Sequence, residues 1–321
     1  MTRLDGRGTG AGAAAVAATP LRVMAFAGAH NLPLFTAEAA GFFAGRGLAV
    51  TVSTAPNSKL LRDGLAEGRF DLVHAAVDNA FAMVDGGADI LVVAGGDSSM
   101  NTLFVQPGIA DVAALAGRTV AVDAPDTAYA LQLGAILRRR GLAAGTDYHV
   151  EPVGSTAQRV HALLARPDLA ATMLNPPYSL IAEDRGLRNL GAAAELLGAY
   201  QGIAVFTLRR WAAEHADHLR SYLAALIEGQ RQALADPEGS IRLLAERLEL
   251  DGDVAARTFA AAADPARGLS PDLRLDFAGL RSVLAIRAAA TGRGEPDRPE
   301  RYLDTSFYEQ ALADAGTTTS V

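Results

Sequence analysis

The sequence predicts an α/β protein of two lobes, with the second lobe inserted into the first and a helical carboxy-terminal segment. Short apolar runs alternate with segments of helical periodicity from residue 21 to residue 208, which favours repeated β-α units and a largely parallel sheet. A length of 321 residues suits two lobes better than one. From about Arg209 to Ala290 the apolar pattern becomes almost entirely helical.

The first lobe is expected to comprise residues 21–117 and 200–321. Apolar runs bounded by turn residues predict its strands at 21–27, 49–55, 70–76, 89–96, 101–107 and 200–208. Apolar residues at helical spacing predict helices at 32–48, 58–68 and 78–87, and a last short helix within 299–316.

The second lobe is expected to comprise residues 118–199. The same patterns predict strands at 118–125, 148–154 and 170–175, and helices at 126–142, 155–169 and 176–186. Two chain crossings, near 116–118 and near Tyr200, would form a hinge. The carboxyl ends of strands from both lobes would then meet at a ligand cleft.

Composition excludes several classes of function. Half of the residues are hydrophobic and 20% are charged, which is typical of a globular protein. The net charge is -7 with no basic cluster, so nucleic acid is not an expected partner. There is no cysteine, which excludes disulfides and thiolate metal sites. We find no G-x-S-x-G, H-E-x-x-H or Walker A motif, and therefore assign no cofactor, metal or catalytic residue.

The amino-terminal residues 1–20 are expected to be a disordered tail or a degenerate export signal. Asp5 interrupts the basic start, and the apolar stretch contains only Ala and Val16. The protein would be periplasmic if this segment directs export and cytoplasmic otherwise. No run of 18 apolar residues occurs, so we expect no membrane span.

Hydrogen-bonding side chains follow nearly every predicted strand, which is where open α/β sheets bind ligands. In the first lobe the candidate ligand contacts are His30, Asn31, His74, Asp78, Asn79, Asp97 and Ser98. In the second lobe they are Asp123, Asp126, Thr127, Asn175 and Tyr178, and Tyr200 and Gln201 precede the returning strand. Ser99, Ser155 and Thr156 occupy comparable positions.

These residues also have other interpretations. Asp78, Asp97 and Asp126 are common helix N-cap residues, and His74 could be a satisfied core histidine. His30, His74 and Asp78 could instead converge as a metal or acid-base cluster. Because these strand ends carry aspartates and no arginine or lysine, we expect a neutral, heterocyclic or cationic ligand rather than a strong anion.

The chain resembles the substrate-binding proteins for nitrate, sulfonate, taurine and thiamine-pyrimidine-like ligands, which have the type II periplasmic binding fold. The resemblance rests on the order and spacing of segments such as "LAEGRFDLVHAAVDNAFAM", "ATMLNPPYSLIAEDRG" and "YLDTSFYEQAL", and it covers residues 21–313. It implies two lobes that close on a small molecule, contacts from "AGAHN", "HAAVDN", "DAPDT" and "NPPY", and delivery to an ABC permease without catalysis.

Three hypotheses follow. The first is a monomeric solute-binding protein that feeds an ABC importer. The second is a cytosolic enzyme on the same scaffold, which would use His30 or His74 with Asp78 as an acid-base pair on an aromatic or heterocyclic substrate. The third is a ligand sensor whose closure is read by a partner protein.

Overall fold

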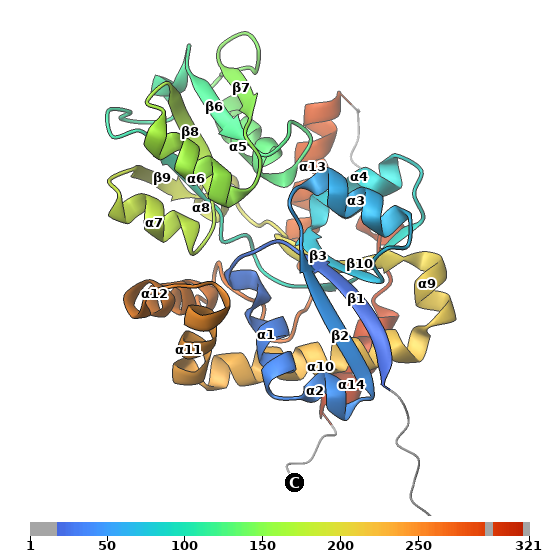
Figure 1. The fold of residues 1–321 in the computed structure, drawn as a ribbon. Coiled ribbons are helices and arrows are strands. Elements are labelled where there is room, and N and C mark those ends of the chain that lie inside the picture. Colours follow the sequence, from blue (N-terminus) through green and yellow to red (C-terminus); the bar gives the residue numbers. More distant parts are fainter. Residues whose placement is uncertain (1–17, 293–297, 317–321) are drawn as a thin grey trace, which may run out of the picture.

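The computed structural model describes residues 18–292 and 298–316, which form two five-stranded sheets flanked by helices (Figure 1). One sheet has the strand order β2-β1-β3-β10-β4 and the other has the order β7-β6-β8-β5-β9. Every strand of the second sheet lies between β4 and β10 in the sequence. The predicted insertion of the second lobe into the first is therefore confirmed.

In the first sheet, β1 is parallel to β2 and β3, and β10 returns antiparallel between β3 and β4. The predicted helix at 32–48 is two helices, because Gly41 adopts a left-handed φ of 75° between them. The strands are β1 (Thr19–Ala25), β2 (Leu48–Thr54), β3 (Leu72–Ala76), β4 (Ile90–Gly95) and β10 (Ile203–Leu208). The helices are α1 (Leu32–Ala39), α2 (Phe42–Gly45), α3 (Ser58–Ala66) and α4 (Val77–Asp85).

In the second sheet, β6 is parallel to β7 and β8, and β5 runs antiparallel to β8 and β9. A capping box of Ser155 and Gln158 begins α6. The strands are β5 (Thr102–Val105), β6 (Thr119–Val122), β7 (His149–Pro152), β8 (Leu169–Leu174) and β9 (Arg188–Ala192). The helices are α5 (Ala128–Arg138), α6 (Thr156–Ala165), α7 (Tyr178–Asp184) and α8 (Ala193–Leu197).

The structure differs from the expected division of the chain at one strand. Residues 101–107 were expected in the first lobe, yet β5 pairs with β8 and β9 of the second sheet. The first crossing is therefore the segment after Gly95 and before Thr102, rather than residues 116–118. The second crossing, which leads into β10 at Ile203, passes through Tyr200 as expected.

The carboxy-terminal part is helical, as predicted, and most of it surrounds the first sheet (Figure 1). The long helix α10 packs against α1 and α14, and α13 reaches α5 of the second lobe. These helices are α9 (Arg209–Glu214), α10 (Ala216–Ala235), α11 (Pro237–Arg247), α12 (Gly252–Ala262), α13 (Phe277–Thr291) and α14 (Ser306–Gly316). Of the expected amino-terminal tail or signal, residues 1–17 lie outside the described residues, whereas Thr19 and Pro20 belong to β1.

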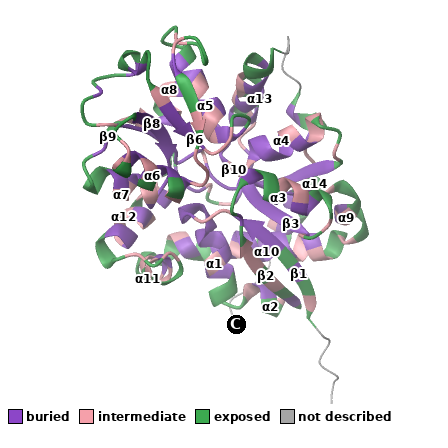
Figure 2. Ribbon diagram, turned by 45° about the horizontal axis from the view of Figure 1, so that its top comes forward, coloured by how far each residue is buried: buried purple, intermediate pink, exposed green. Residues whose placement is uncertain are grey.

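The hydrophobic core of each lobe is built on its sheet (Figure 2). Every residue of β4 and of β8 is buried, which explains why these strands read as continuous apolar runs. In the part of the chain that the structure describes, no helix combines the length and apolar character needed to cross a membrane.

A candidate ligand-binding site between the two lobes

A cavity of about 370 Å³ lies between the lobes. A smaller cavity of about 20 Å³ shares five of its residues and lies toward the chain crossings. In the first lobe the larger cavity is lined by Phe26, Ala27, His30, residues 54–58, Ala76, Asn79 and Ile203. In the second lobe it is lined by Asp123, residues 127–129, residues 155–159 and Tyr178. The smaller cavity adds the predicted residues Asp97, Asn175 and Tyr200.

His30 presents a neutral imidazole at this site. It follows β1 in a short turn and is almost completely buried. Its Nε2–H donates to the carbonyl oxygen of Phe26 at 3.1 Å, which leaves Nδ1 as an acceptor. Burial lowers the pKa of His30 to about 4, so the ring carries no charge at pH 7. A Cβ at Gly28 would lie 2.8 Å from Nδ1, so this position must lack a side chain.

Asn79 brings an unpaired acceptor to the wall of the larger cavity. Its Nδ2 donates to the carbonyl oxygen of Ala76 at 3.3 Å, whereas its Oδ1 is buried and has no hydrogen-bond partner among the described residues. An unsatisfied buried acceptor costs about 1–3 kcal/mol. A ligand with an N–H or O–H group beside Asn79 would remove that cost.

Asp123 and Arg159 place opposite charges on the second-lobe wall. The hydroxyl of Thr127 donates to Asp123 Oδ1, and burial raises the pKa of Asp123 while the charge of Arg159 opposes that shift. Arg159 was not predicted, because its position in α6 resembles an ordinary helix residue. The expectation of a cleft with acids and no arginine is therefore wrong.

Arg159 is held by the protein itself. It is fully buried, and its four hydrogen bonds go to uncharged acceptors. These acceptors are Gly154 O, Thr156 Oγ1, Thr172 Oγ1 and Met173 O. A guanidinium has five N–H donors, so one donor remains for a ligand.

Tyr129 forms a flat wall of the cavity and was also missed by the sequence analysis. The Arg159 guanidinium lies over its ring, with Cζ 4.5 Å from the ring centroid. Its hydroxyl donates to Asn175 Oδ1 at 3.2 Å, which holds the ring from the other end. Phe26 and Tyr178 also line the cavity, so aromatic side chains face it from both lobes.

His74 lies in the core rather than at the cavity. A hydrogen bond of 2.7 Å joins its Nε2 to the hydroxyl of Tyr222 in α10, and the two rings pack edge to face. Burial lowers the pKa of His74 to about 3, with a smaller contribution from His30. The satisfied core histidine is thus the interpretation that the contacts support.

Acid is therefore expected to destabilise the protein through His74. Its folded pKa lies below the ordinary value of 6.5, so the unfolded chain binds more protons between pH 3 and 6.5, and stability falls as pH falls through that range. Urea unfolding at pH 7.5 and at pH 5 measures how far the free energy of unfolding falls between the two. That fall should be about 2 kcal/mol smaller in His74→Gln than in the wild type. His149→Gln, at an exposed position of β7, is the control for replacing a histidine. An equally steep loss in His74→Gln and in the wild type would contradict the prediction.

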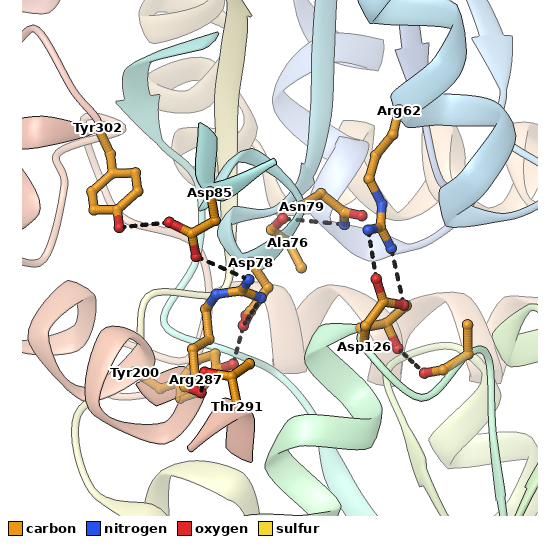
Figure 3. Close-up of polar contacts among 12 residues, drawn as sticks. Arg62, Ala76, Asp78, Asn79, Asp85, Asp126, Tyr200, Arg287, Thr291 and Tyr302 are labelled. Atoms are coloured by element: carbon orange, nitrogen blue, oxygen red, sulfur yellow. Dashed lines mark hydrogen bonds and ion pairs between the residues drawn. The ribbon is translucent and has the colours of Figure 1, made fainter. Parts of the chain in front are cut away.

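Asp78 is part of a buried network behind the cavity (Figure 3). Its Oδ2 accepts a hydrogen bond of 2.7 Å from the hydroxyl of Tyr200, and Arg287 of α13 lies 3.7 Å from its Oδ1. Arg287 also pairs with Asp85 at 3.6 Å. Burial raises the pKa of Asp78, and Arg287 and Tyr200 oppose that shift. Asp78 thus connects α4, the second crossing and α13, and does not line either cavity.

The acid-base pair of His74 with Asp78 and the metal cluster considered from the sequence do not form. His74 and Asp78 have separate partners, Tyr222 and Tyr200. No group of three His, Asp or Glu side chains able to hold a metal ion occurs within residues 18–292 and 298–316.

The two crossings are joined at Asp97, which lines the smaller cavity. Its Oδ1 accepts from the backbone N–H of Ser99 at 2.7 Å and of Ile203 at 3.3 Å, and its carbonyl oxygen accepts from Gly202 N at 2.9 Å. Burial raises the pKa of Asp97 to about 6. Asp97 therefore holds the two crossings together and also faces the smaller cavity.

The remaining predicted contacts are directed elsewhere. Gln201 Nε2 donates to the carbonyl oxygens of Asp97 and Ile203, and Asn31 Nδ2 donates to that of Phe26 at 2.6 Å. Ser98 lines neither cavity. Asp126 pairs with Arg62 of α3, whose hydrogen bond lowers the pKa of Asp126.

Two sheets joined by two crossings around a shared cavity define a two-lobed protein with the fold of the periplasmic binding proteins. More particularly, the chain belongs to the NMT1-like family, which matches residues 15–249. The predicted family resemblance is thus confirmed. No curated protein sequence matches the chain.

Three solved structures illustrate the likeness in fold. The periplasmic nitrate-binding protein NrtA from Synechocystis PCC 6803 has a TM-score of 0.77 at 14% identity, covering 94% of this chain and 92% of NrtA. The ligand-binding component of an ABC-type import system from Staphylococcus aureus has a TM-score of 0.76 at 15% identity, covering 91% and 99%. The alkanesulfonate-binding protein SsuA from Xanthomonas axonopodis pv. citri has a TM-score of 0.75 at 22% identity, covering 91% and 100%.

Proposed function

We propose that the protein is a solute-binding protein that closes two lobes on a small organic ligand and delivers it to the permease of an ABC importer. The observation that carries this proposal is the cavity whose walls come from both lobes, because a ligand held there stabilises their closed arrangement. The proteins named above as nitrate-binding, alkanesulfonate-binding and ligand-binding import components support the same role.

The ligand is neutral or cationic and carries a planar group with hydrogen-bond donors. The charges of Asp123 and Arg159 compensate each other. Four of the five N–H donors of Arg159 already bind acceptors of the protein, so the site offers little to a strong anion. Asn79 Oδ1 and the neutral ring of His30 supply acceptors. The ring of Tyr129 provides a surface on which a heterocycle can stack.

Asn79→Ala should weaken ligand binding about 2- to 10-fold while leaving the melting temperature nearly unchanged. The expected loss is that of one hydrogen bond of about 0.5–1.5 kcal/mol, whereas the folded protein loses only a 3.3 Å contact to Ala76. Native mass spectrometry identifies the co-purifying ligand, and calorimetry then measures its affinity. Asn189→Ala, on β9 away from the larger cavity, is the matched control, and an unchanged affinity in Asn79→Ala would exclude Asn79 from the site.

The function itself is tested with a panel of solutes on protein freed of ligand. Neutral amides and N-heterocycles should raise the melting temperature, because a ligand at 100 times its Kd stabilises by about 2.7 kcal/mol. Nitrate and alkanesulfonates should have little effect, and the opposite ranking would overturn the proposed ligand class. Conversion of the bound solute into another compound would replace the transport role with the enzyme hypothesis.

In this role the chain is a monomer that meets its permease outside the cytoplasmic membrane, provided that the amino-terminal segment directs export. Fractionation of the native cells tests the location. Recovery of the protein only in the cytoplasm would favour the enzyme or sensor hypothesis.

A further inference from the structure

An ion pair joins the two lobes beside the larger cavity. Arg62 lies on α3 of the first lobe, and Asp126 lies just before α5 of the second. Arg62 Nη1 donates to Asp126 Oδ2 at 2.7 Å, and Nη2 donates to Oδ1 at 3.3 Å (Figure 3). Such a bidentate contact fixes the orientation of the guanidinium and the carboxylate as well as the distance between them.

The neighbours of these two residues place the pair at the rim of the cavity. Ser58, the first residue of α3, lines the cavity, and Arg62 follows one helical turn later. Thr127 lines the cavity from the other lobe and directly follows Asp126. The side chain of Asp126 is 63% exposed and that of Arg62 is 18% exposed, so the pair lies at the surface of the protein beside the cavity.

Two other ion pairs also join the lobes. Arg257 of α12 pairs with Asp184 of α7 at 2.8 Å, and Arg267 pairs with Glu195 of α8 at 3.2 Å. Arg267 lines a third cavity, distinct from the two described above, together with Met100 of the first crossing. Rotation about a hinge moves distant parts farther than near parts, so the pair at the rim depends more on closure than the Arg267 pair, which lies beside the first crossing.

We propose that Arg62 and Asp126 form an electrostatic latch that favours the closed arrangement of the lobes and raises ligand affinity from outside the cavity. Neither side chain lines the cavity, so both are positioning residues. The Nε of Arg62 is buried without a hydrogen-bond partner among the described residues, so the interlobe contact provides the hydrogen bonds that hold this guanidinium.

The latch is tested by measuring the distance between the lobes in protein without ligand, prepared by unfolding and refolding. Because the chain has no cysteine, Ala49→Cys on β2 and Val150→Cys on β7 create two label positions at exposed edge strands. Pulsed electron-spin resonance then gives the ratio of open to closed molecules. Arg62→Gln should raise that ratio about two- to five-fold, the range of an exposed ion pair.

Controls separate the latch from a general effect of charge. Arg69→Gln removes an arginine that pairs with Glu67 inside the first lobe, and should leave the ratio unchanged. Salt at 1 M, where the Debye length is about 3 Å, should open the wild type more than Arg62→Gln, which among the described residues keeps only the Arg257 and Arg267 pairs between the lobes. The charge exchange Arg62→Asp with Asp126→Arg should restore closure.

The proposal is overturned if Arg62→Gln has the same ratio as the wild type, or if the charge exchange is as open as the single variant. A melting temperature close to that of the wild type in Arg62→Gln excludes a merely structural role. Because no ligand is present, this result does not depend on the identity of the solute or on the transport role.

Discussion

Replacing Gly202 with alanine is expected to destabilise the protein by about 1–3 kcal/mol, the cost of inserting a methyl group where atoms are already packed. An added Cβ would lie 1.9 Å from Asp97 Oδ1 and 2.7 Å from the backbone nitrogen of Ser99. Neither neighbour can withdraw freely, since the Gly202 N–H donates to the Asp97 carbonyl oxygen and Ser99 N–H donates to the Asp97 carboxylate. The two crossings would have to separate.

Urea unfolding measures the loss of stability, and Gly45→Ala is the matched control. Gly45 lies in α2 with no atom within 4 Å of its added Cβ, so alanine there should be neutral or slightly stabilising. Ligand affinity should also fall in Gly202→Ala, because the smaller cavity includes Gly202 and Asp97. Unchanged stability in Gly202→Ala would show that the two crossings can separate without a cost in free energy.

The periodicity of the sequence was sufficient to predict most elements of the fold but not the sheet to which each strand belongs. A buried strand such as β5 is apolar on both faces whichever sheet it joins, so residues 101–107 gave no sign that β8 and β9 are its partners. Strand β9 was missed because its sequence "RNLGA" has one large apolar residue and lies largely at the surface.

The candidate site was predictable where a side chain directly follows a strand. His30, Asn79, Asp123, Thr127 and Tyr178 were chosen for this reason, and all of them line the larger cavity. Asp78 was selected by the same rule, and His74 was selected near the end of its strand. Their partners Arg287 and Tyr222 come from helices more than a hundred residues later. Local sequence cannot reveal such distant partners.

Two residues that line the cavity, Tyr129 and Arg159, were missed by the sequence analysis because they do not directly follow a strand. Tyr129 and Arg159 occupy positions in α5 and α6 that read as ordinary parts of helices, and they acquire a role because the two helices start at the same cavity. A buried arginine changes the charge of the whole site. The charge of a binding site therefore has to be counted over every element that borders it, rather than over the strand ends alone.

Arg159→Met should be the most damaging single change, with a loss of about 3–5 kcal/mol, as when one partner of a buried pair of charges is removed. The substitution keeps an apolar stem but leaves Gly154 O and Met173 O without their donor. It also frees the ring of Tyr129, so ligand binding should be lost in whatever fraction of the protein still folds.

The charge and the packing of Arg159 can be separated by the pH dependence of that loss. Burial already raises the pKa of Asp123, and Arg159 opposes the shift, so its removal should raise that pKa further. When the pKa of a carboxyl is higher in the folded protein than in the unfolded chain, the free energy of unfolding falls as pH rises through the pKa of the folded protein. The loss of unfolding free energy in Arg159→Met, relative to the wild type, should therefore be larger at pH 8 than at pH 5 in urea unfolding. Arg159→Lys should remove most of that pH dependence while recovering only part of the stability, because an ammonium cannot reproduce the planar set of donors.

Arg166→Met, which removes an arginine that pairs with Glu151 and Asp168 at the surface of the same lobe, should stay close to the wild type at both pH values. An equal deficit at pH 5 and pH 8 in Arg159→Met would show that Arg159 acts through packing and hydrogen bonds alone. In that case the charge of Asp123 would be available to the ligand, and cationic solutes would be favoured over neutral ones.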